Sequence, residues 1–470
     1  MLTFTNAARA ETAAQARADR HAAIIAVTQE HLAAAAPTVA DREVGPLLGY
    51  LEALLDWVRL DLTRGQRLRE CSEVVSDASL PDSQVSARPE PRETELATVV
   101  SQLVTDEAEG DRSAGEQLRR ILLELAYVDS GVRATALGTS TVPMPLKPTV
   151  IDHEALSRML RGRLRLDALE VESVNPGGGI SMLTHFVTYR VGGRSEEVVL
   201  RQVPAGVAPE GLLREYGVLR YIRQAGLPVP EPLWLEETTN DIGMPFMISA
   251  RARGIPLGTF AAATVPVDQA LCVKLAHLLA KLHTLDVSEI GATPVPSMAE
   301  PIDVLNAIGG VERMALSTGP ISAQLAAVLA WLRANVPGPP ERPSLLHGDL
   351  NFSNLLAEGD QLFALLDWER AHIGDPAEDL AYLKPSLAPV FDWHRFCDLY
   401  QQAGGAPQQS ESMRFYTVWQ NAWRHVECLA RATNFDMSPT LHNAIPAFVL
   451  GPQFLSAAVH HAILPEGINQ

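Results

Sequence analysis

The sequence predicts an α+β protein in which a segment of helices precedes a two-lobed region. Three observations support this prediction. Positions 1–140 are rich in alanine and leucine, with apolar residues spaced three and four apart. Alternating apolar residues and glycine turns follow at 150–250, as in a small antiparallel sheet. Helical spacing returns over 251–470. We therefore expect an all-α N-terminal domain, a small lobe built on a sheet and a mostly helical second lobe.

Length and charge limit the class of protein. A chain of 470 residues is long enough for two or three domains. Its net charge of −18 argues against binding to duplex nucleic acid and against a polybasic membrane anchor. None of the four cysteines forms a CxxC pair, and no apolar stretch is long enough to cross a bilayer. We expect a cytoplasmic protein with neither nucleic acid nor membrane as a partner.

The first domain gives no chemical signal. Apolar residues at helical spacing occupy 47–62, and two further helices are expected near 93–107 and 114–130. Three prolines within 138–148 mark a domain boundary. The N-terminal helices could form a homodimer interface, a lid over a substrate or a surface for a partner, and the sequence does not choose among them.

The predicted sheet begins with a glycine-rich turn between two strands. The strands are expected at 166–174, 181–191 and 197–203, and a helix follows at 209–223. The turn contains Gly177, Gly178, Gly179 and Ser181. Backbone N–H groups in such a turn can approach a phosphate closely. A plain hairpin turn would have the same composition, so the glycines alone are a weak signal.

The chain also predicts a second hairpin. Two apolar runs, 354–357 and 362–366, are separated by a Glu-Gly-Asp-Gln turn. Pairing Ala357 with Leu362 closes the turn tightly and leaves the other ends of the two strands side by side.

Three oxygen-bearing side chains meet at the open end of this hairpin. Asn354 and Asp367 flank the two strands, and Asp349 lies just upstream in a His-Gly-Asp sequence. Hard oxygen donors suit a Mg²⁺ ion that carries substrate phosphates, and a remaining carboxylate can accept a proton from a hydroxyl group. Each residue alone could be a turn residue, but their joint spacing, D-x4-N-x12-D, favours a catalytic site.

This spacing resembles the catalytic region of the aminoglycoside phosphotransferase and choline kinase group, relatives of protein kinases. The resemblance implies a bilobal protein-kinase-like fold, with ATP or GTP as phosphate donor and Mg²⁺ as cofactor. It makes Asp349 the catalytic base, and Asn354 and Asp367 the metal ligands. It also implies a structural role for His347. Farther on, Asp375 fits a helix cap and Asp379 could brace the catalytic loop.

The resemblance also assigns residues in the first lobe. The strand lysine of kinases is replaced by Arg201, a cation that can still hold phosphates with bidentate geometry. Its partner on the helix would be Glu215. The chain would cross between the lobes after Ser249 and Ala250, where backbone groups contact the base of the nucleotide.

The arginine motif and its surroundings resemble one branch of this group, the kinase-like domains fused to some acyl-CoA dehydrogenases. That branch implies a hydroxyacyl-CoA as acceptor, whereas the wider family also suggests an antibiotic, a sugar or an amino alcohol. An aromatic stretch near 415–427 could line the acceptor site or simply belong to the core. The alternative function is that of a nucleotide-binding pseudokinase that acts through a partner, for which the replacement of lysine by Arg201 is the one argument.

Overall fold

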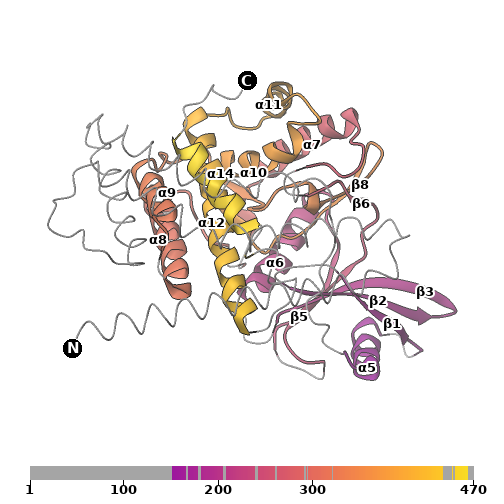
Figure 1. The fold of residues 1–470 in the computed structure, drawn as a ribbon. Helices are drawn as coiled ribbons and strands as arrows, with labels where there is room; N and C mark the ends of the chain where they lie inside the picture. Colours follow the sequence, from indigo (N-terminus) through magenta and orange to yellow (C-terminus); the bar gives the residue numbers. More distant parts are fainter. Residues whose placement is uncertain are drawn as a thin grey trace, which may run out of the picture. The chain divides into compact units, whose positions relative to one another are not determined.

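A computed structural model describes residues 151–463, with internal gaps at 166–167, 178–181, 205–207, 239–241, 260–261, 291–292, 294, 320, 438–446 and 448–449. The chain divides into two compact units (Figure 1). Within the described part of the chain, the sheet unit takes its residues from 151–300 and 338–413, and the helical unit from 301–337 and 414–463. The all-α domain expected at 1–140 lies outside the described residues.

The sheet unit is built on a five-stranded antiparallel sheet in the order β1-β2-β3-β5-β4. The strands are β1 (Glu170–Pro176), β2 (Leu183–Val191), β3 (Arg194–Gln202), β4 (Pro232–Glu236) and β5 (Phe246–Ala250). The antiparallel sheet predicted from the alternating pattern is confirmed. β1 begins at Glu170, four residues later than expected, and the helix before it, α5 (His153–Leu164), ends in a left-handed cap at Arg165. The strand also runs on through Pro176, a residue tolerated there because β1 is an edge strand.

The two faces of this sheet differ. α5 packs on one face, where its Leu156 and Leu160 share a buried cluster with Val187 and Leu200. Residues directly opposite each other on neighbouring strands lie on the same face. Thr184 therefore shares a face with Arg201, its partner on β3, and this face is opposite to that of Leu200. The sheet thus directs Arg201 away from α5.

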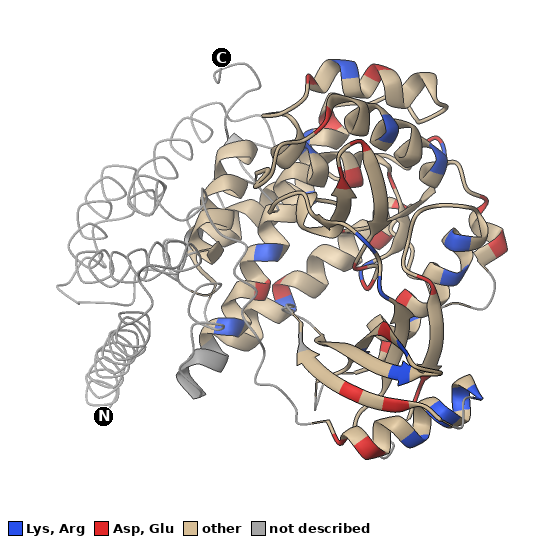
Figure 2. Cartoon of the chain, turned by 90° about the vertical axis from the view of Figure 1, so that its right-hand side faces the viewer, with Lys and Arg blue, Asp and Glu red and all other residues tan. Residues whose placement is uncertain are grey.

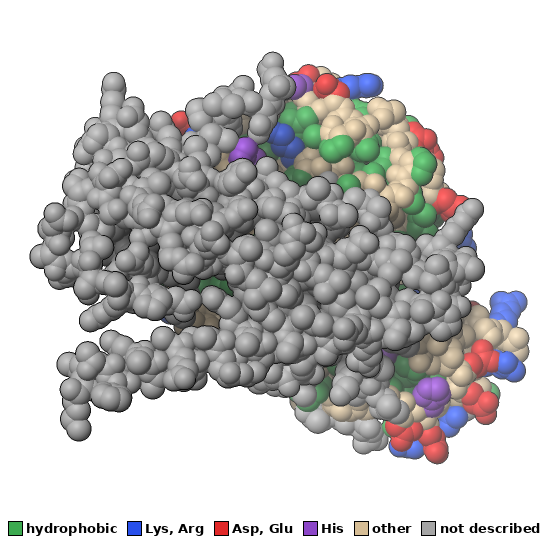
Figure 3. All heavy atoms as spheres, in the orientation of Figure 1, with side chains coloured by type: hydrophobic (Ala, Val, Ile, Leu, Met, Phe, Trp, Pro, Cys, Tyr) green, Lys and Arg blue, Asp and Glu red, His purple; other side chains and the backbone are tan. Residues whose placement is uncertain are grey.

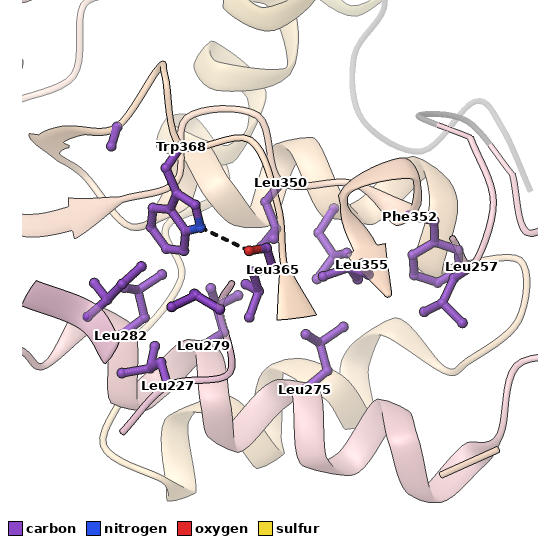
Figure 4. Close-up of a cluster of buried hydrophobic side chains, with 14 of the residues drawn as sticks. Leu227, Leu257, Leu275, Leu279, Leu282, Leu350, Phe352, Leu355, Leu365 and Trp368 are labelled. Atoms are coloured by element: carbon purple, nitrogen blue, oxygen red, sulfur yellow. Dashed lines mark hydrogen bonds between the residues drawn. The ribbon is translucent and has the colours of Figure 1, made fainter. Parts of the chain in front are cut away.

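A second core lies among the helices and hairpins of the sheet unit. These elements are α6 (Glu210–Gln224), α7 (Gln269–His283), η3 (Val287–Ile290), β6 (Ile255–Pro256), β7 (Ser344–Leu346), η4 (Phe352–Asn354), β8 (Leu355–Glu358), β9 (Gln361–Leu365), β10 (His372–Gly374), α10 (Ala377–Leu387) and α11 (Trp393–Gln402). Figure 4 shows leucines of α7 facing Leu350, Leu365 and Trp368. The indole N–H of Trp368 donates to the Leu365 carbonyl at 3.2 Å. This packing anchors both ends of the segment that carries Asp349 and Asp367.

The start of α10 differs in detail from the predicted helix cap. The Asp375 carboxylate accepts from the backbone N–H of Ala377 at 2.9 Å, as a capping residue does. The helix begins at Ala377, one residue later than a cap at Asp375 would place it. Glu378 does not reach back to complete a capping box; it contacts His372 at 3.1 Å instead.

The described part of the helical unit contains α8 (Pro301–Thr318), α9 (Ala323–Ala334), α14 (Gly451–Ile463) and α12 (Ser410–Met437), most of which belongs to this unit. α14 packs on α9. Arg414 joins the two chain segments, because it donates to the carbonyls of His461 and Ala462 and lies over Trp331. The helical region that the sequence predicted is confirmed here. Among the described helices, none is sufficiently long and apolar to cross a membrane.

Candidate active site

The loop after β7 takes its shape from a glycine and a buried histidine. Gly348 has a φ of +77°, and a Cβ at this position would lie 2.5 Å from the Arg370 carbonyl oxygen. Only glycine fits both constraints. His347 is fully buried, and its Nε2 lies 2.7 Å from the Leu366 carbonyl, so this nitrogen carries the proton. The histidine thus ties the loop to the residue before Asp367, in keeping with its predicted structural role.

Asp379 braces this loop from beneath. Its fully buried carboxylate accepts the backbone N–H groups of His347 at 2.8 Å and Gly348 at 2.9 Å. His283 contacts the same carboxylate at 3.1 Å and the Tyr400 hydroxyl at 2.8 Å. Burial alone would raise the pKa of Asp379, but the hydrogen bonds and charge of His283 and the loop N–H groups hold it below its usual value. The loop is therefore fixed by an ionised, fully buried group.

Two amide side chains orient Asp349. The Nδ2 groups of Asn351 and Asn354 donate to the Asp349 backbone carbonyl at 3.0 and 2.8 Å. Each also lies 3.3 Å from an oxygen of the Asp349 carboxylate. The predicted base and one predicted metal ligand are therefore in direct contact, and the Asn354 amide is oriented with its nitrogen toward the loop.

Asp367 stands where the predicted hairpin places it. β8 pairs with β9 and Ala357 lies opposite Leu362, as predicted. The Leu366 N–H donates to the Asn354 carbonyl at 2.8 Å, which brings Asn354 and Asp367 to the same end of the hairpin. Asp367 has a φ of +68°, a left-handed conformation that is uncommon outside glycine. Such strain persists where the surroundings enforce it, often at functional sites.

Arg201 connects the sheet to this loop. Its guanidinium donates to the Glu215 carboxylate on α6, and its second terminal nitrogen donates to Asp367 at 2.8 Å. Glu369 lies 3.7 Å from the same nitrogen. The arginine side chain is only 14% exposed and that of Glu215 only 2%, so solvent screens these pairs weakly. The fold thus brings together the predicted strand cation, its predicted helix partner and the predicted metal ligand.

The charges in this cluster shift one another. Burial would lower the pKa of Arg201, but the charges of Glu215, Asp367 and Glu369 outweigh it and leave this pKa above its usual value. Burial raises the pKa of Glu215 to about 7, an effect that Arg201 opposes and Asp367 reinforces. The guanidinium is therefore the permanent charge of the site, and it faces several carboxylates.

The other predicted residues of the first lobe divide into two groups. Gly178, Gly179 and Ser181 lie outside the described residues. Gly177 directly follows the last residue of β1, and its N–H donates to the Thr184 carbonyl at 2.7 Å. A Cβ there would lie 2.9 Å from the Thr184 side chain, so the strand needs glycine at this position.

At the end of β5, Ser249 lies opposite Val199 and is buried, on the face of the sheet that carries Arg201. Ala250 is the last residue of the strand, and its N–H donates to the Glu231 carbonyl at 2.9 Å. Ser249 therefore lies on the same face as Arg201, opposite a residue two positions before it on β3. Ala250 lies where the chain leaves the sheet.

The sequence did not point to several residues of this site. Glu369 joins the carboxylates around Arg201, and its position two residues after Asp367 was a usable signal. Asn351 orients Asp349 from within the loop. Phe186 and Val199 face each other across β2 and β3, on the side of the sheet that carries Arg201. Only the register of the sheet reveals that pair.

The suggested acceptor residues belong to a different unit from the predicted base. The aromatic residues Phe415, Tyr416, Trp419 and Trp423 belong to the helical unit and are all buried, as core residues are. His425 is also buried there; burial lowers the pKa of His425 to about 4, despite a contact of 2.8 Å with the Gly451 carbonyl. These observations favour the core interpretation of the aromatic stretch.

The arginines of α5 do not form a separate basic surface. Arg163 pairs with Glu236 at 3.0 Å, and Arg158 lies 3.6 Å from Glu154. Figure 2 shows acidic residues at the start of α5 and basic residues toward its end. Figure 3 shows both signs of charge side by side at this end of the sheet unit.

An antiparallel sheet with a buried strand cation, next to a loop that presents an oriented aspartate, defines the kinase-like class of phosphotransferases. The chain belongs to the phosphotransferase enzyme family, whose sequence profile matches residues 178–416. This membership confirms both the predicted family and the predicted enzyme class.

Individual relatives agree with the family. The chain is 27% identical over 298 residues to acyl-CoA dehydrogenase family member 10 of Mus musculus, a match that covers 60% of this chain and 27% of the relative. It is 25% identical over 234 residues to hygromycin-B 4-O-kinase of Escherichia coli, covering 47% of this chain and 66% of that enzyme. It spans roughly 27% to 30% of the length of the first dehydrogenase-family relatives it matches.

The fold also has a counterpart among solved structures. A Ralstonia eutropha protein assigned as an aminoglycoside phosphotransferase superposes with a TM-score of 0.52 at 20% identity. The match covers 66% of this chain and 98% of that protein. It supports the α+β architecture of an antiparallel sheet and a helical region that the sequence predicted.

Proposed function

We propose that this protein transfers the γ-phosphate of ATP or GTP to a hydroxyl group of a small molecule, with Mg²⁺ as cofactor. The observation that carries the proposal is the convergence of Asp349, Asn354, Asp367 and Arg201 in the sheet unit. These residues come from a loop, a hairpin and a strand, and Arg201 contacts Asp367 across 166 positions of sequence. Family membership supports the same reaction.

Asp349 acts as the base. The amides of Asn351 and Asn354 hold its carboxylate in one orientation. There it can accept the proton of the acceptor hydroxyl as the oxygen attacks the γ-phosphorus, whose bond to the departing nucleoside diphosphate breaks. Little covalent chemistry is required of the protein, because phosphoryl transfer depends mainly on alignment and charge neutralisation. A rigid loop is therefore a catalytic asset, and Asp379 supplies that rigidity.

The donor set suits a magnesium ion that arrives with the nucleotide. Asn354 directs its nitrogen into the loop, and its side-chain oxygen, which has the Ser353 hydroxyl at 3.5 Å, would be the ligand for a cation. Asp367 would add a carboxylate. Among the described residues, no group of three or more His, Cys, Asp or Glu side chains could hold a metal ion by itself. Sites of this kind use one or two protein oxygens and complete the coordination with phosphates and water. Bound there, Mg²⁺ would neutralise charge on the phosphates.

Arg201 and the sheet face hold the nucleotide. The guanidinium, kept in place by Glu215, offers planar donors to phosphate oxygens. Phe186, Val199 and Ser249 form a row on the same face, two residues along the strands from Arg201, and offer a surface for the base. The Gly177 N–H is already bonded to the Thr184 carbonyl. Backbone N–H groups at Gly178, Gly179 and Ser181, which lie outside the described residues, would be the phosphate donors of the glycine turn. Backbone groups next to Ser249 and Ala250 would contact the base.

Two acceptor classes are supported. A hydroxyacyl-CoA is suggested by the relatives named as acyl-CoA dehydrogenase family members, and an antibiotic hydroxyl by the relative named hygromycin-B 4-O-kinase. Both classes present an alcohol to the same base, so the chemistry assigned to Asp349 is common to them.

The test is a transfer assay read by mass spectrometry. The purified chain is incubated with Mg²⁺ and ATP or GTP, together with a panel of hydroxyacyl-CoAs, aminoglycosides and macrolides. We expect one acceptor class to gain a single phosphoryl group, and Asp349→Asn to abolish the gain. Asp360→Asn is the matched control, because Asp360 lies in the hairpin turn and pairs with Lys274. Nucleotide binding without transfer to any acceptor would favour the pseudokinase alternative.

A further inference from the structure

We propose that Arg201 occupies the place of the metal ion in the nucleotide-free protein, so that the site accepts a divalent cation only together with nucleotide phosphates. This inference rests on the proposed function and adds a second role to Arg201. The residue then selects for the metal–nucleotide complex over the free metal.

The first argument is the geometry of one guanidinium between two carboxylates. One terminal nitrogen of Arg201 bonds to Glu215 and the other bonds to Asp367 at 2.8 Å. Arginine can do this because its donors form a rigid planar fork. A lysine ammonium is a compact charge on a flexible stem, and it does not span two acceptors with the same fixed geometry. The lysine-to-arginine departure in the sequence therefore has a structural consequence.

The second argument is that Asp367 cannot easily turn away. Its φ of +68° is a strained backbone state. The preceding residue, Leu366, is held through both of its backbone polar groups, because its N–H donates to the Asn354 carbonyl and its own carbonyl accepts from His347. A cation that needs Asp367 must therefore compete with Arg201 for the carboxylate where it stands.

The third argument is electrostatic. A free divalent cation at Asp367 would approach a guanidinium that is 86% buried, and like charges repel strongly in such a place. It would also take from a buried N–H donor of Arg201 its 2.8 Å acceptor on Asp367, leaving only the Glu369 carboxylate at 3.7 Å. A nucleotide removes both obstacles, because its phosphates neutralise the cation and offer new acceptors to the arginine. Glu215 holds the other side of the guanidinium, so Arg201 can turn from Asp367 to a phosphate while it stays bound to Glu215.

The experiment measures the binding of Mn²⁺ alone by electron paramagnetic resonance. We expect weak or no binding to the wild-type protein, and roughly tenfold or greater tightening in Arg201→Met. The Mn²⁺ affinity of Arg201→Lys should lie between those of the wild type and Arg201→Met. The control is Arg190→Met, which removes an ion-paired arginine from the same sheet, where its partner is Glu172. This control should leave Mn²⁺ binding unchanged.

A second pair of variants guards against misfolding and locates the metal. Arg201→Met leaves Glu215 buried without its cation, so Arg201→Met combined with Glu215→Gln removes both charges and should also bind Mn²⁺ alone. Adding Asp367→Asn to either variant should abolish that binding. Equal Mn²⁺ affinity in wild-type protein and Arg201→Met, or no Mn²⁺ binding in both folded Arg201 variants, would overturn the inference.

A parallel titration separates this inference from the proposed function. Wild-type protein is titrated with Mn²⁺ in the presence of ATP or GTP, and we expect binding there. Absence of binding with either nucleotide would overturn the proposed function and the inference together. Binding with a nucleotide, and equally tight binding without one, would overturn the inference alone.

Discussion

The loop that carries Asp349 and the cluster around Arg201 are held together in different ways. Asp349 is oriented by Asn351 and Asn354, both within five residues of it, and its loop rests on the buried Asp379. Arg201 joins a strand to a helix residue 14 positions away and to Asp367, 166 positions away. The first region is a local construction on a buried brace, whereas the second exists only when sheet, helix and hairpin are all in place.

This difference separates catalysis from ligand binding. A locally built loop can keep its geometry whether or not a nucleotide is bound, so changes to it should reduce turnover more than nucleotide affinity. The Arg201 cluster exchanges partners when phosphates arrive, so changes to it should affect nucleotide and metal binding first. Variants of the two regions should therefore separate in kcat and KM.

The largest effect is expected at the base. Asp349→Asn keeps the shape of the side chain and removes its ability to accept a proton, so turnover should fall by at least ~100-fold. Nucleotide affinity should change little, because the loop and its brace are intact. Steady-state kinetics with the acceptor found by the transfer assay would measure both. If Asp349→Asn instead weakened nucleotide binding and left turnover unchanged, the two regions would not differ in the way described.

The next effect is expected at the brace. Asp379→Asn removes a buried charge that accepts two loop N–H groups and pairs with His283, which should cost about 3 kcal/mol of unfolding free energy. Because the pKa of Asp379 is lowered on folding, its contribution is present above the unfolded pKa of roughly 4 and is lost as the pH falls through the lower folded value. The free energy of unfolding of the variant should therefore decrease less than that of the wild type as the pH falls.

Urea denaturation of both proteins at several pH values measures this contribution. We also expect a roughly tenfold fall in turnover, since the loop loses its fixed position. If Asp379→Asn had the same free energy of unfolding as the wild type at pH 7, and lost it in the same way as the pH falls, the brace would contribute little to stability.

A smaller effect, on binding, is expected at the strand cation. Arg201→Lys keeps the positive charge and loses the planar fork, so the dissociation constant for the nucleotide should rise by roughly tenfold. Turnover at saturating nucleotide should fall less than this, in contrast to the Asp349 variant. Calorimetric titration of the variant and of Arg190→Met as control would measure it.

The smallest effect is expected at the second amide. Asn351→Ala removes one of the two amides that orient Asp349, at a cost of about 1 kcal/mol, or a factor of about five in turnover. Asn354→Ala should have a larger effect, because Asn354 is also a proposed metal ligand. Equal effects of the two variants in kinetic assays would argue that Asn354 acts only by orienting the base.

The sequence predicts the local parts of this site better than the distant ones. The hairpin that pairs Ala357 with Leu362 was predictable because alternation and a glycine turn act over a few residues. The fork from Arg201 to Asp367 was not, because it depends on the register of a sheet against a loop far along the chain. Likewise, Glu378 does not complete the predicted capping box, because its side chain contacts His372, a buried partner that the capping pattern does not contain.

Isothermal titration of the protein with ATP and with GTP, in Mg²⁺ and in EDTA, tests the central claim most directly. For wild-type protein we predict saturable binding of at least one nucleotide that requires Mg²⁺, and loss of the Mg²⁺-dependent part in Asp367→Asn. No binding of either nucleotide at millimolar concentration, or binding that ignores both Mg²⁺ and Asp367, would contradict the claim that these residues form a phosphotransferase active site.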